Sequence, residues 1–179
     1  MTQTARVYGG SLYELAAEET LTDTIREQML AVLDLFRENP DYLALLCEPS
    51  IAKEERTGLI ETAFGTQTER YLVSFLKLLC EKGILREYAG CCEEFTRRYN
   101  ADHNIAEAVV TSAVALTDSQ AAALKEKLEQ LSGKTIVLTQ KIDPSVVAGL
   151  CVELEGKQLD GTAKGRIQGI SRKLADVVL

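Results

Sequence analysis

Apolar side chains recur every three or four positions through residues 4–105, which is the spacing that places them on one face of an α-helix. Prolines and glycines interrupt this pattern, and clear interruptions fall at Pro40, Pro49, Gly65 and Gly83. We therefore expect six helices, over residues 5–17, 21–38, 41–47, 51–64, 68–82 and 86–100. Six amphipathic helices with short connections are typical of a helical bundle.

The helical pattern ends at residues 101–104. Three later segments favour β-strands, namely Ala106–Val114, Thr135–Thr139 and Leu150–Leu154. In the third, Leu150, Val152 and Leu154 alternate with Cys151, Glu153 and Glu155, as in a half-buried strand. The turn dipeptide Glu155-Gly156 then predicts that the chain doubles back on itself.

Two further helices are expected in this second half. Thr117-Asp118-Ser119 is a helix start, and Ser132-Gly133 ends that helix. Its buried stripe is expected to consist of Leu124, Leu128 and Leu131. From Ala163 the period is helical again, with one face made of Ile167, Ile170, Leu174 and Val177. The order strand–helix–strand–strand–strand–helix is that of an α+β domain.

The predicted fold class is therefore mainly α. We expect a six-helix bundle over residues 1–104, followed by a small α+β domain over residues 105–179. The boundary is placed where the helical periodicity stops and the strand pattern begins.

Two helices of the predicted bundle have unusual features. Gly9 and Gly10 interrupt the first helix, where each costs about 1 kcal/mol relative to alanine, so packing or a bound partner must hold it. The fifth helix has an apolar arc wider than one neighbour requires, because Tyr71 and Leu78 extend it. An amphipathic partner helix could lie in a groove between these two helices. Both helices could equally complete the bundle core, and the pattern alone favours neither interpretation.

The acidic side chains are unevenly distributed. Residues 1–105 carry 18 acidic and 11 basic side chains, whereas residues 106–179 carry nine of each, so the net charge of −7 lies in the first half. Binding to a nucleic-acid backbone needs a basic surface, and we therefore exclude nucleic acid as a partner. The acidic residues either form a solvated surface or steer a partner of complementary charge.

Membrane and secretion signals are absent from the pattern. No apolar run approaches the roughly 18 residues of a membrane span, and the first twenty residues lack a basic start followed by an apolar core. We expect a cytosolic protein whose contact with any membrane is made through its partners.

Candidate chemistry is sparse. The five cysteines lack the paired spacing of zinc sites, and the single histidine, His103, has no neighbour at metal-ligand spacing. The cysteines are Cys47, Cys80, Cys91, Cys92 and Cys151. Reduced structural thiols are the favoured interpretation, with a metal or redox site as the alternative. No catalytic residue, metal or cofactor is expected.

One turn deserves comparison with known anion sites. Glycines, a hydroxyl and two cations in Asp160–Arg166 precede a predicted helix, whose free amides could hold an anion. The turn matches neither the phosphate-binding loop nor the dinucleotide-binding pattern. Close helix packing is the favoured explanation for its glycines. An anion- or nucleotide-binding adaptor that uses Gly161–Arg166 is the alternative function.

Several short motifs, taken in their order along the chain, resemble a known family. They are Ala5-Arg6-Val7-Tyr8, Asn39-Pro40, Pro49-Ser50-Ile51, Leu78–Gly83, Lys141-Ile142-Asp143-Pro144, Ala148-Gly149, Asp160-Gly161-Thr162 and Gly165-Arg166. The ordered set covers essentially the whole chain and is similar to the delta subunit of the bacterial rotary F-type ATP synthase. The mitochondrial relative is the oligomycin-sensitivity-conferring subunit.

The resemblance implies a non-catalytic connector. In that family the N-terminal six-helix domain binds the amino-terminal helix of an alpha subunit, and the C-terminal domain binds the b subunit of the peripheral stalk. The family's protein thereby joins the catalytic head to the stator and couples proton flow to ATP synthesis. It would act at the cytoplasmic face of the bacterial plasma membrane, as a peripheral part of the complex. A free-standing adaptor outside any ATP synthase is a further alternative.

The resemblance also implies binding residues. Carried over by position, the groove for the alpha helix would be lined by Tyr8, Leu12, Leu72, Phe75 and Leu79. The end that binds the stalk would use one face of the last helix or its opposite basic face, through Ile167, Ile170 and Leu174 or Lys164, Arg166 and Lys173.

Overall fold

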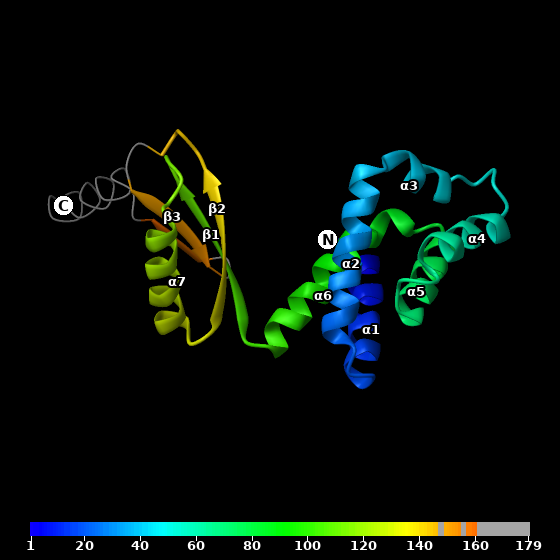
Figure 1. Cartoon of the computed structure of the whole chain (residues 1–179), viewed down its shortest axis with the longest axis horizontal. Helices are drawn as coiled ribbons and strands as arrows, with labels where there is room; N and C mark the ends of the chain where they lie inside the picture. The colour runs from blue at the N-terminus through cyan, green and yellow to red at the C-terminus, as the bar shows by residue number, and fades with distance from the viewer. Residues whose placement is uncertain (147–148, 155–156, 161–179) are drawn as a thin grey trace, which may run out of the picture. The chain divides into compact units, whose positions relative to one another are not determined.

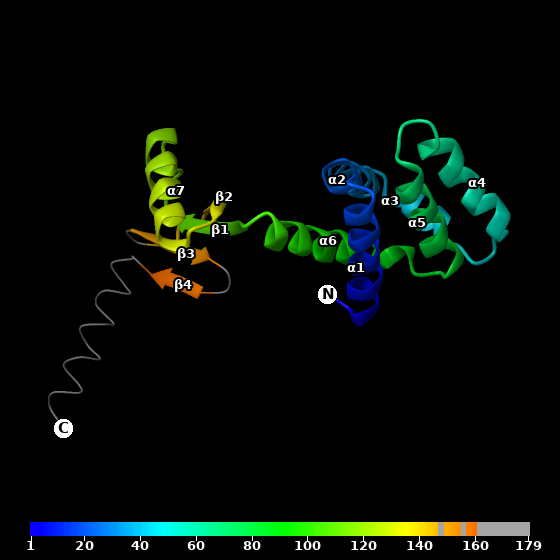
Figure 2. The same cartoon turned by 90° about the horizontal axis from the view of Figure 1, so that it is seen from below.

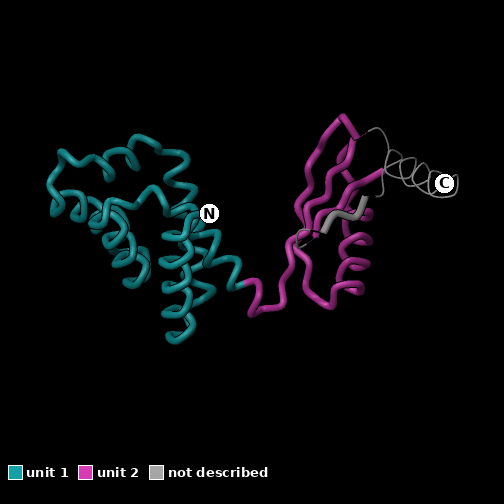
Figure 3. The backbone as a smooth tube through the Cα atoms, turned by 180° about the vertical axis from the view of Figure 1, so that it is seen from behind, with its two compact units in different colours: residues 1–99 teal, residues 100–179 magenta. Residues whose placement is uncertain are grey.

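The computed structural model describes residues 1–146, 149–154 and 157–160. The chain divides into two compact units, Met1–Tyr99 and Asn100–Leu179, which Figure 3 colours teal and magenta. The described part is mainly helical with one small sheet, which agrees with the predicted fold class. The units divide after Tyr99, whereas the sequence indicated a boundary after residue 104.

The first unit is built from α-helices. They are α1 (Gln3–Glu18), α2 (Thr22–Glu38), α3 (Pro40–Leu46), α4 (Lys53–Phe64), α5 (Arg70–Glu81) and α6 (Tyr88–Asp102), with a 3-10 turn at Leu85–Glu87 before α6. Helix α2 contacts both α1 and α5, and Figure 1 shows these three helices together. Pro40 stands at the first position of α3, where its missing N–H costs nothing. Gly83 follows α5 with φ of +68°, a conformation that glycine adopts without strain.

Aromatic side chains form the centre of this unit. The ring of Phe36 in α2 lies 5.5 Å from that of Tyr88 and 6.3 Å from that of Phe64, edge-on in both cases. Tyr13 of α1 meets Phe95 of α6 edge-on at 5.2 Å. Each such pair contributes about 0.5–1.5 kcal/mol beyond the area it buries. The rings therefore tie α1 and α2 to α6, and α4 to α2.

The two glycines of α1 mark its contact with α6. A Cβ atom on Gly9 would lie 2.5 Å from the main-chain oxygen of Cys91. A Cβ atom on Gly10 would lie 2.4 Å from the guanidinium of Arg98. The glycines thus allow a close approach of the two helices, and this packing offsets their cost of about 1 kcal/mol each. Gly9 and Gly10 lie on the side of α1 that contacts α6, where larger side chains would clash.

A buried carboxylate adds a second link between α1 and α6. Glu94 is 0% exposed and accepts two hydrogen bonds from Arg97, at 2.8 and 2.7 Å, and one from Arg98 at 2.9 Å. Arg98 also donates to Glu14 of α1 at 2.7 Å. The hydrogen bonds from Arg97 and then Arg98, against the effect of burial, lower the pKa of Glu94 to about 2. Glu94 therefore stays ionised and orients Arg98 toward α1.

The second unit is a small sheet with one helix. Its elements are β1 (Ile105–Ser112), α7 (Asp118–Ser132), β2 (Thr135–Ile142), β3 (Leu150–Leu154) and β4 (Lys157–Asp160). The strand order is β2-β1-β3-β4, with β1 parallel to β2 and the other pairs antiparallel. Figure 2 shows α7 standing on one side of the strands. Thr117 and Gln120 form a capping box at the start of α7, and Gly133 ends it with φ of +68°.

The core of this unit lies between α7 and the sheet. Its buried members are Ala106, Ala108, Val110, Leu128, Ile136 and Val152. Leu124 packs against them as predicted, and Leu116 does so from the loop before α7. Leu131, expected in the same stripe, is 72% exposed and so does not belong to this core. The helix predicted from Ala163 falls outside the described residues.

Candidate functional site

Helix α5 is buried along its centre and along one edge. Leu72, Leu76 and Leu79 are each 0% exposed. On one side of this row, the thiol of Cys80 donates to the main-chain oxygen of Leu46 in α3 at 3.4 Å. The neighbouring helix thus closes the edge of α5 that carries Cys80.

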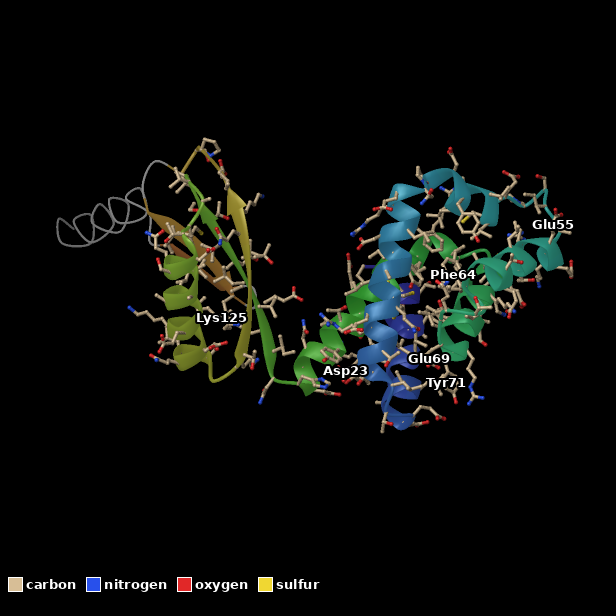
Figure 4. The ribbon with its side chains drawn as sticks, viewed as in Figure 1. Asp23, Glu55, Phe64, Glu69, Tyr71 and Lys125 are labelled. Atoms are coloured by element: carbon tan, nitrogen blue, oxygen red, sulfur yellow. The ribbon has the colours of Figure 1, made fainter. Side chains whose placement is uncertain are left out.

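The opposite edge of α5 is only partly covered. It carries Tyr71, Phe75 and Leu78 at the spacing of one helix face. Leu78 is 39% exposed and Tyr71 is half-buried, whereas Phe75 is 7% exposed. Tyr71 lies at the start of the helix in Figure 4, with the guanidinium of Arg70 4.7 Å from its ring centre. This edge therefore presents apolar surface beside one cation.

Helix α1 carries a row of residues spaced by three or four positions, Tyr8, Leu12 and Leu15, and Glu19 follows as its C-cap residue. The pKa of Arg70 is raised mainly by its hydrogen bond to Tyr71 and further by the negative charge of Glu19. Glu19 follows α1 and Arg70 begins α5, and Figures 1 and 2 show these two helices as neighbours.

We call the partly exposed apolar residues on these two sides the α1–α5 surface. It consists of Tyr8, Leu15, Tyr71 and Leu78. The sequence pattern pointed to Tyr71 and Leu78 through the unusual width of the apolar arc on α5, but the residues carried over by family position did not include them. Leu15 was likewise visible as an apolar position of α1 and was not singled out.

The residues predicted to line the groove lie at different depths. Leu12, Leu72 and Leu79 are 3%, 0% and 0% exposed, so they belong to the core of the first unit. Phe75 is 7% exposed, and Tyr8 is partly exposed. The helical period signals burial, and burial in the bundle produces the same signal as burial under a partner. The groove assignment of these five residues stays a prediction.

The predicted stalk-binding residues fall outside the described residues. They are Lys164, Arg166, Ile167, Ile170, Lys173 and Leu174. The alternative anion site at Gly161–Arg166 falls there too. Neither prediction is tested by the part of the chain that the structure describes.

The described cysteines have the environment of packed thiols. Cys80, Cys91 and Cys92 are buried, and burial is the main cause that raises the pKa of Cys91 to about 11 and of Cys92 to about 12. Thiols with such pKa values hold little thiolate at neutral pH. Within residues 1–146, 149–154 and 157–160, no group of three or more His, Cys, Asp or Glu side chains could hold a metal ion. In the same ranges, no helix is long and apolar enough to cross a membrane.

Comparison with solved structures gives the fold. The chain is similar to one in the mitochondrial ATP synthase hexamer of Toxoplasma gondii, with 12% identity and a TM-score of 0.74 over 98% of both chains. It is also similar to a chain of the Polytomella F-ATP synthase, with 16% identity and a TM-score of 0.53 over 57% of this chain and 90% of that one. At these identities the likeness concerns the fold.

Sequence comparison identifies the relatives. An ATP synthase subunit delta from Acetivibrio thermocellus is 32% identical over 161 residues, covering 89% of this chain and 90% of the relative. Another from Lachnoclostridium phytofermentans is 28% identical over 176 residues, covering 98% and 97%. The family model described as ATP synthase delta (OSCP) subunit matches residues 4–174. The chain therefore belongs to the ATP synthase delta (OSCP) subunit family.

Proposed function

We propose that this chain is the non-catalytic connector of an F-type ATP synthase, which ties the catalytic head to the peripheral stalk. Family membership over residues 4–174 is the observation that carries this proposal. The role requires two binding surfaces on one chain, and a chain of two compact units can supply them separately. Torque from rotation is then resisted by the stator, so that proton flow is coupled to ATP synthesis.

The head-binding domain in this proposal is the helical region of residues 1–104, arranged as a six-helix bundle. Its partner is the amino-terminal helix of an alpha subunit, laid on the α1–α5 surface. An amphipathic helix places apolar anchors at i, i+3, i+4 and i+7 on one side, and such a row matches the partly exposed apolar side chains there. Leu12, Leu72 and Leu79 are buried on the same two helices. Phe75 and Tyr8 then complete the predicted groove.

The stalk-binding domain is the α+β region of residues 105–179, and its partner is the b-type subunit. The predicted contacts are the last helix of the sequence or its basic face, as carried over from the family. The whole complex would hold this chain at the cytoplasmic face of the bacterial plasma membrane. The chain itself would touch the membrane only through other subunits.

Titration with a peptide of the alpha amino terminus tests the head-binding surface. Leu78 is 39% exposed, so Leu78→Asp leaves the core intact and buries an unpaired carboxylate only when the partner binds. We expect the variant to weaken binding by roughly a hundredfold, which corresponds to a cost of about 3 kcal/mol. Leu45→Asp, at a 41% exposed position on α3, is the matched control and should bind as the wild type does.

Two results would refute this assignment. Equal binding by folded Leu78→Asp and wild type would remove the α1–α5 surface from the interface. Failure of the chain to co-purify with other synthase subunits would contradict the connector role itself.

A further inference from the structure

Strand β2 forms one edge of the described sheet, and its hydrogen bonds to β1 fix which groups face outward. The N–H of Thr135 donates to the oxygen of Asn104 at 2.9 Å, and the N–H of Asp143 donates to the oxygen of Ser112 at 2.9 Å. N–H and C=O groups of one residue point to the same side of a strand, and successive residues alternate. The odd-numbered residues of β2 therefore pair with β1, and the even-numbered residues face away from the sheet.

The first outward group is already occupied by a side chain. The N–H of Ile136 donates to the carboxylate of Glu129 in α7 at 3.1 Å. Beyond it, the main-chain groups of Leu138, Gln140 and Ile142 point outward, and β2 pairs with no second strand among the described residues. The side-chain oxygen of Gln140 already accepts a hydrogen bond from the N–H of Leu116 at 3.2 Å, so it is bonded to a group outside β2.

The edge has little of the usual protection against pairing. Proteins block such edges with proline, bulges or charged side chains, lysine above all. All eight residues of β2 continue in register with β1 without a bulge, and the strand contains no proline. Its only charged residue is Lys141, while Val137 and Ile142 are 48% and 57% exposed. Within the described residues, an extended template with Lys141 as its one charge is therefore open from Leu138 to Ile142.

We propose that an extended segment of another ATP synthase subunit adds as a further strand beside β2, bonded to the main chain of Leu138, Gln140 and Ile142. This inference rests on the proposed function. The occupant is a strand because the outward groups repeat about every 6.6 Å, a spacing that another strand reproduces. A helix satisfies its own main-chain groups and offers none for this ladder.

The charge of Lys141 disfavours a second copy of this chain that pairs through its own β2. Opposite charges facing each other across a strand pair stabilise it, and like charges weaken it. A second copy pairing through its own β2 brings no acidic residue to Lys141, since that lysine is the only charge of the strand. Asp143, next along the chain, already accepts the N–H of Ser145 at 2.9 Å. The partner segment accordingly carries an acidic residue opposite Lys141 and β-branched residues around it.

Hydrogen exchange at single-amide resolution tests the proposal, on the chain alone and within purified ATP synthase. The amides of Leu138, Gln140 and Ile142 should exchange at least about a hundredfold more slowly in the complex, because each gains a partner that closes it to water. The amides of Val137 and Thr139 pair with β1 in both states and serve as the internal reference.

Two variants at one position separate the main chain from the side chain. Gln140→Pro removes an outward N–H that the ladder with β1 does not use, and an edge strand tolerates proline there. Gln140→Ala keeps the N–H and removes only the amide. In the complex, Gln140→Pro should make the Leu138 and Ile142 amides exchange about tenfold faster, while Gln140→Ala should leave them as in the wild type.

The outcomes separate this inference from the proposed function. Assembly into the synthase with equally fast exchange of the outward amides in both states overturns the added strand and leaves the connector role standing. Failure to assemble overturns the connector role and the added strand together. Slow exchange already present in the chain alone also overturns the proposal, because the edge would then be closed without a partner.

Discussion

Replacing Gly9 by alanine tests whether α1 packs directly on the backbone of α6. The new Cβ atom would lie 2.5 Å from the main-chain oxygen of Cys91 and 2.9 Å from its Cα. Carbon and oxygen atoms at van der Waals contact are about 3.5 Å apart. Neither neighbour is a flexible side chain, so the clash is relieved only if one helix moves.

The expected magnitude follows from two opposing effects. Alanine gains about 1 kcal/mol over glycine in a helix interior. Overpacking against a rigid neighbour costs about 1–3 kcal/mol or more, and the short distance to a backbone atom places this site at the upper end. We therefore expect Gly9→Ala to lower the free energy of unfolding of the first unit by about 2 kcal/mol. For a unit of this size, the melting temperature should fall by about 10 °C.

Thermal and urea unfolding, followed by circular dichroism, provide the assay. Gly58→Ala is the matched control, because a Cβ atom on Gly58 in α4 meets no atom within 4 Å. That variant should gain up to about 1 kcal/mol from helix propensity alone. A Gly9→Ala protein as stable as the wild type, or stabilised like the control, would refute the close contact between α1 and α6.

Two further predictions concern titratable groups. The pKa of Glu94 falls from its ordinary 4.5 to about 2 in the folded chain. Its ion pairs therefore stabilise the fold above pH 4.5, and this stabilisation is lost as the pH falls from 4.5 to about 2. Across this window, the free energy of unfolding should fall less steeply with decreasing pH in Glu94→Gln than in the wild type. An identical pH profile in both proteins would contradict the role of Glu94. A thiol reagent at neutral pH should modify the half-exposed Cys47 well before Cys91 and Cys92, because burial raises the pKa values of Cys91 and Cys92. Mass spectrometry of the native protein measures the rate of modification at each cysteine. Equal rates for the three thiols would show that the first unit opens readily.

Much of the secondary structure follows from local sequence. Proline and glycine set the ends of several helices within a few residues, as Pro40 does for α3 and Gly83 does after α5. The strand-favouring residues of Ala106–Val114 identified β1, although the strand ends at Ser112 and Val114 is 73% exposed. Local patterns sufficed here because the spacing of apolar residues within one strand or helix indicates its type.

The contacts between distant segments could not be derived in this way. Gly9 and Gly10 suggested a weak helix, whereas their purpose depends on Cys91 and Arg98, some eighty residues later. Leu131 has the right spacing for the stripe of α7 but is 72% exposed, and spacing alone does not show which part of the helix the sheet covers. Leu12 and Leu72 carried the same helical signal as the partly exposed Leu78, since periodicity does not distinguish a core from an interface.

Reassembly measures the connector role most directly. ATP synthase heads depleted of this subunit are mixed with membranes that retain the rest of the stalk, and the fraction of heads bound is measured with and without the added chain. The account predicts that wild type and Leu45→Asp restore binding of the heads to the membranes, whereas Leu78→Asp does not. Heads that bind equally well without the chain, or with Leu78→Asp, would contradict the claim that this protein joins the head to the stalk through the α1–α5 surface.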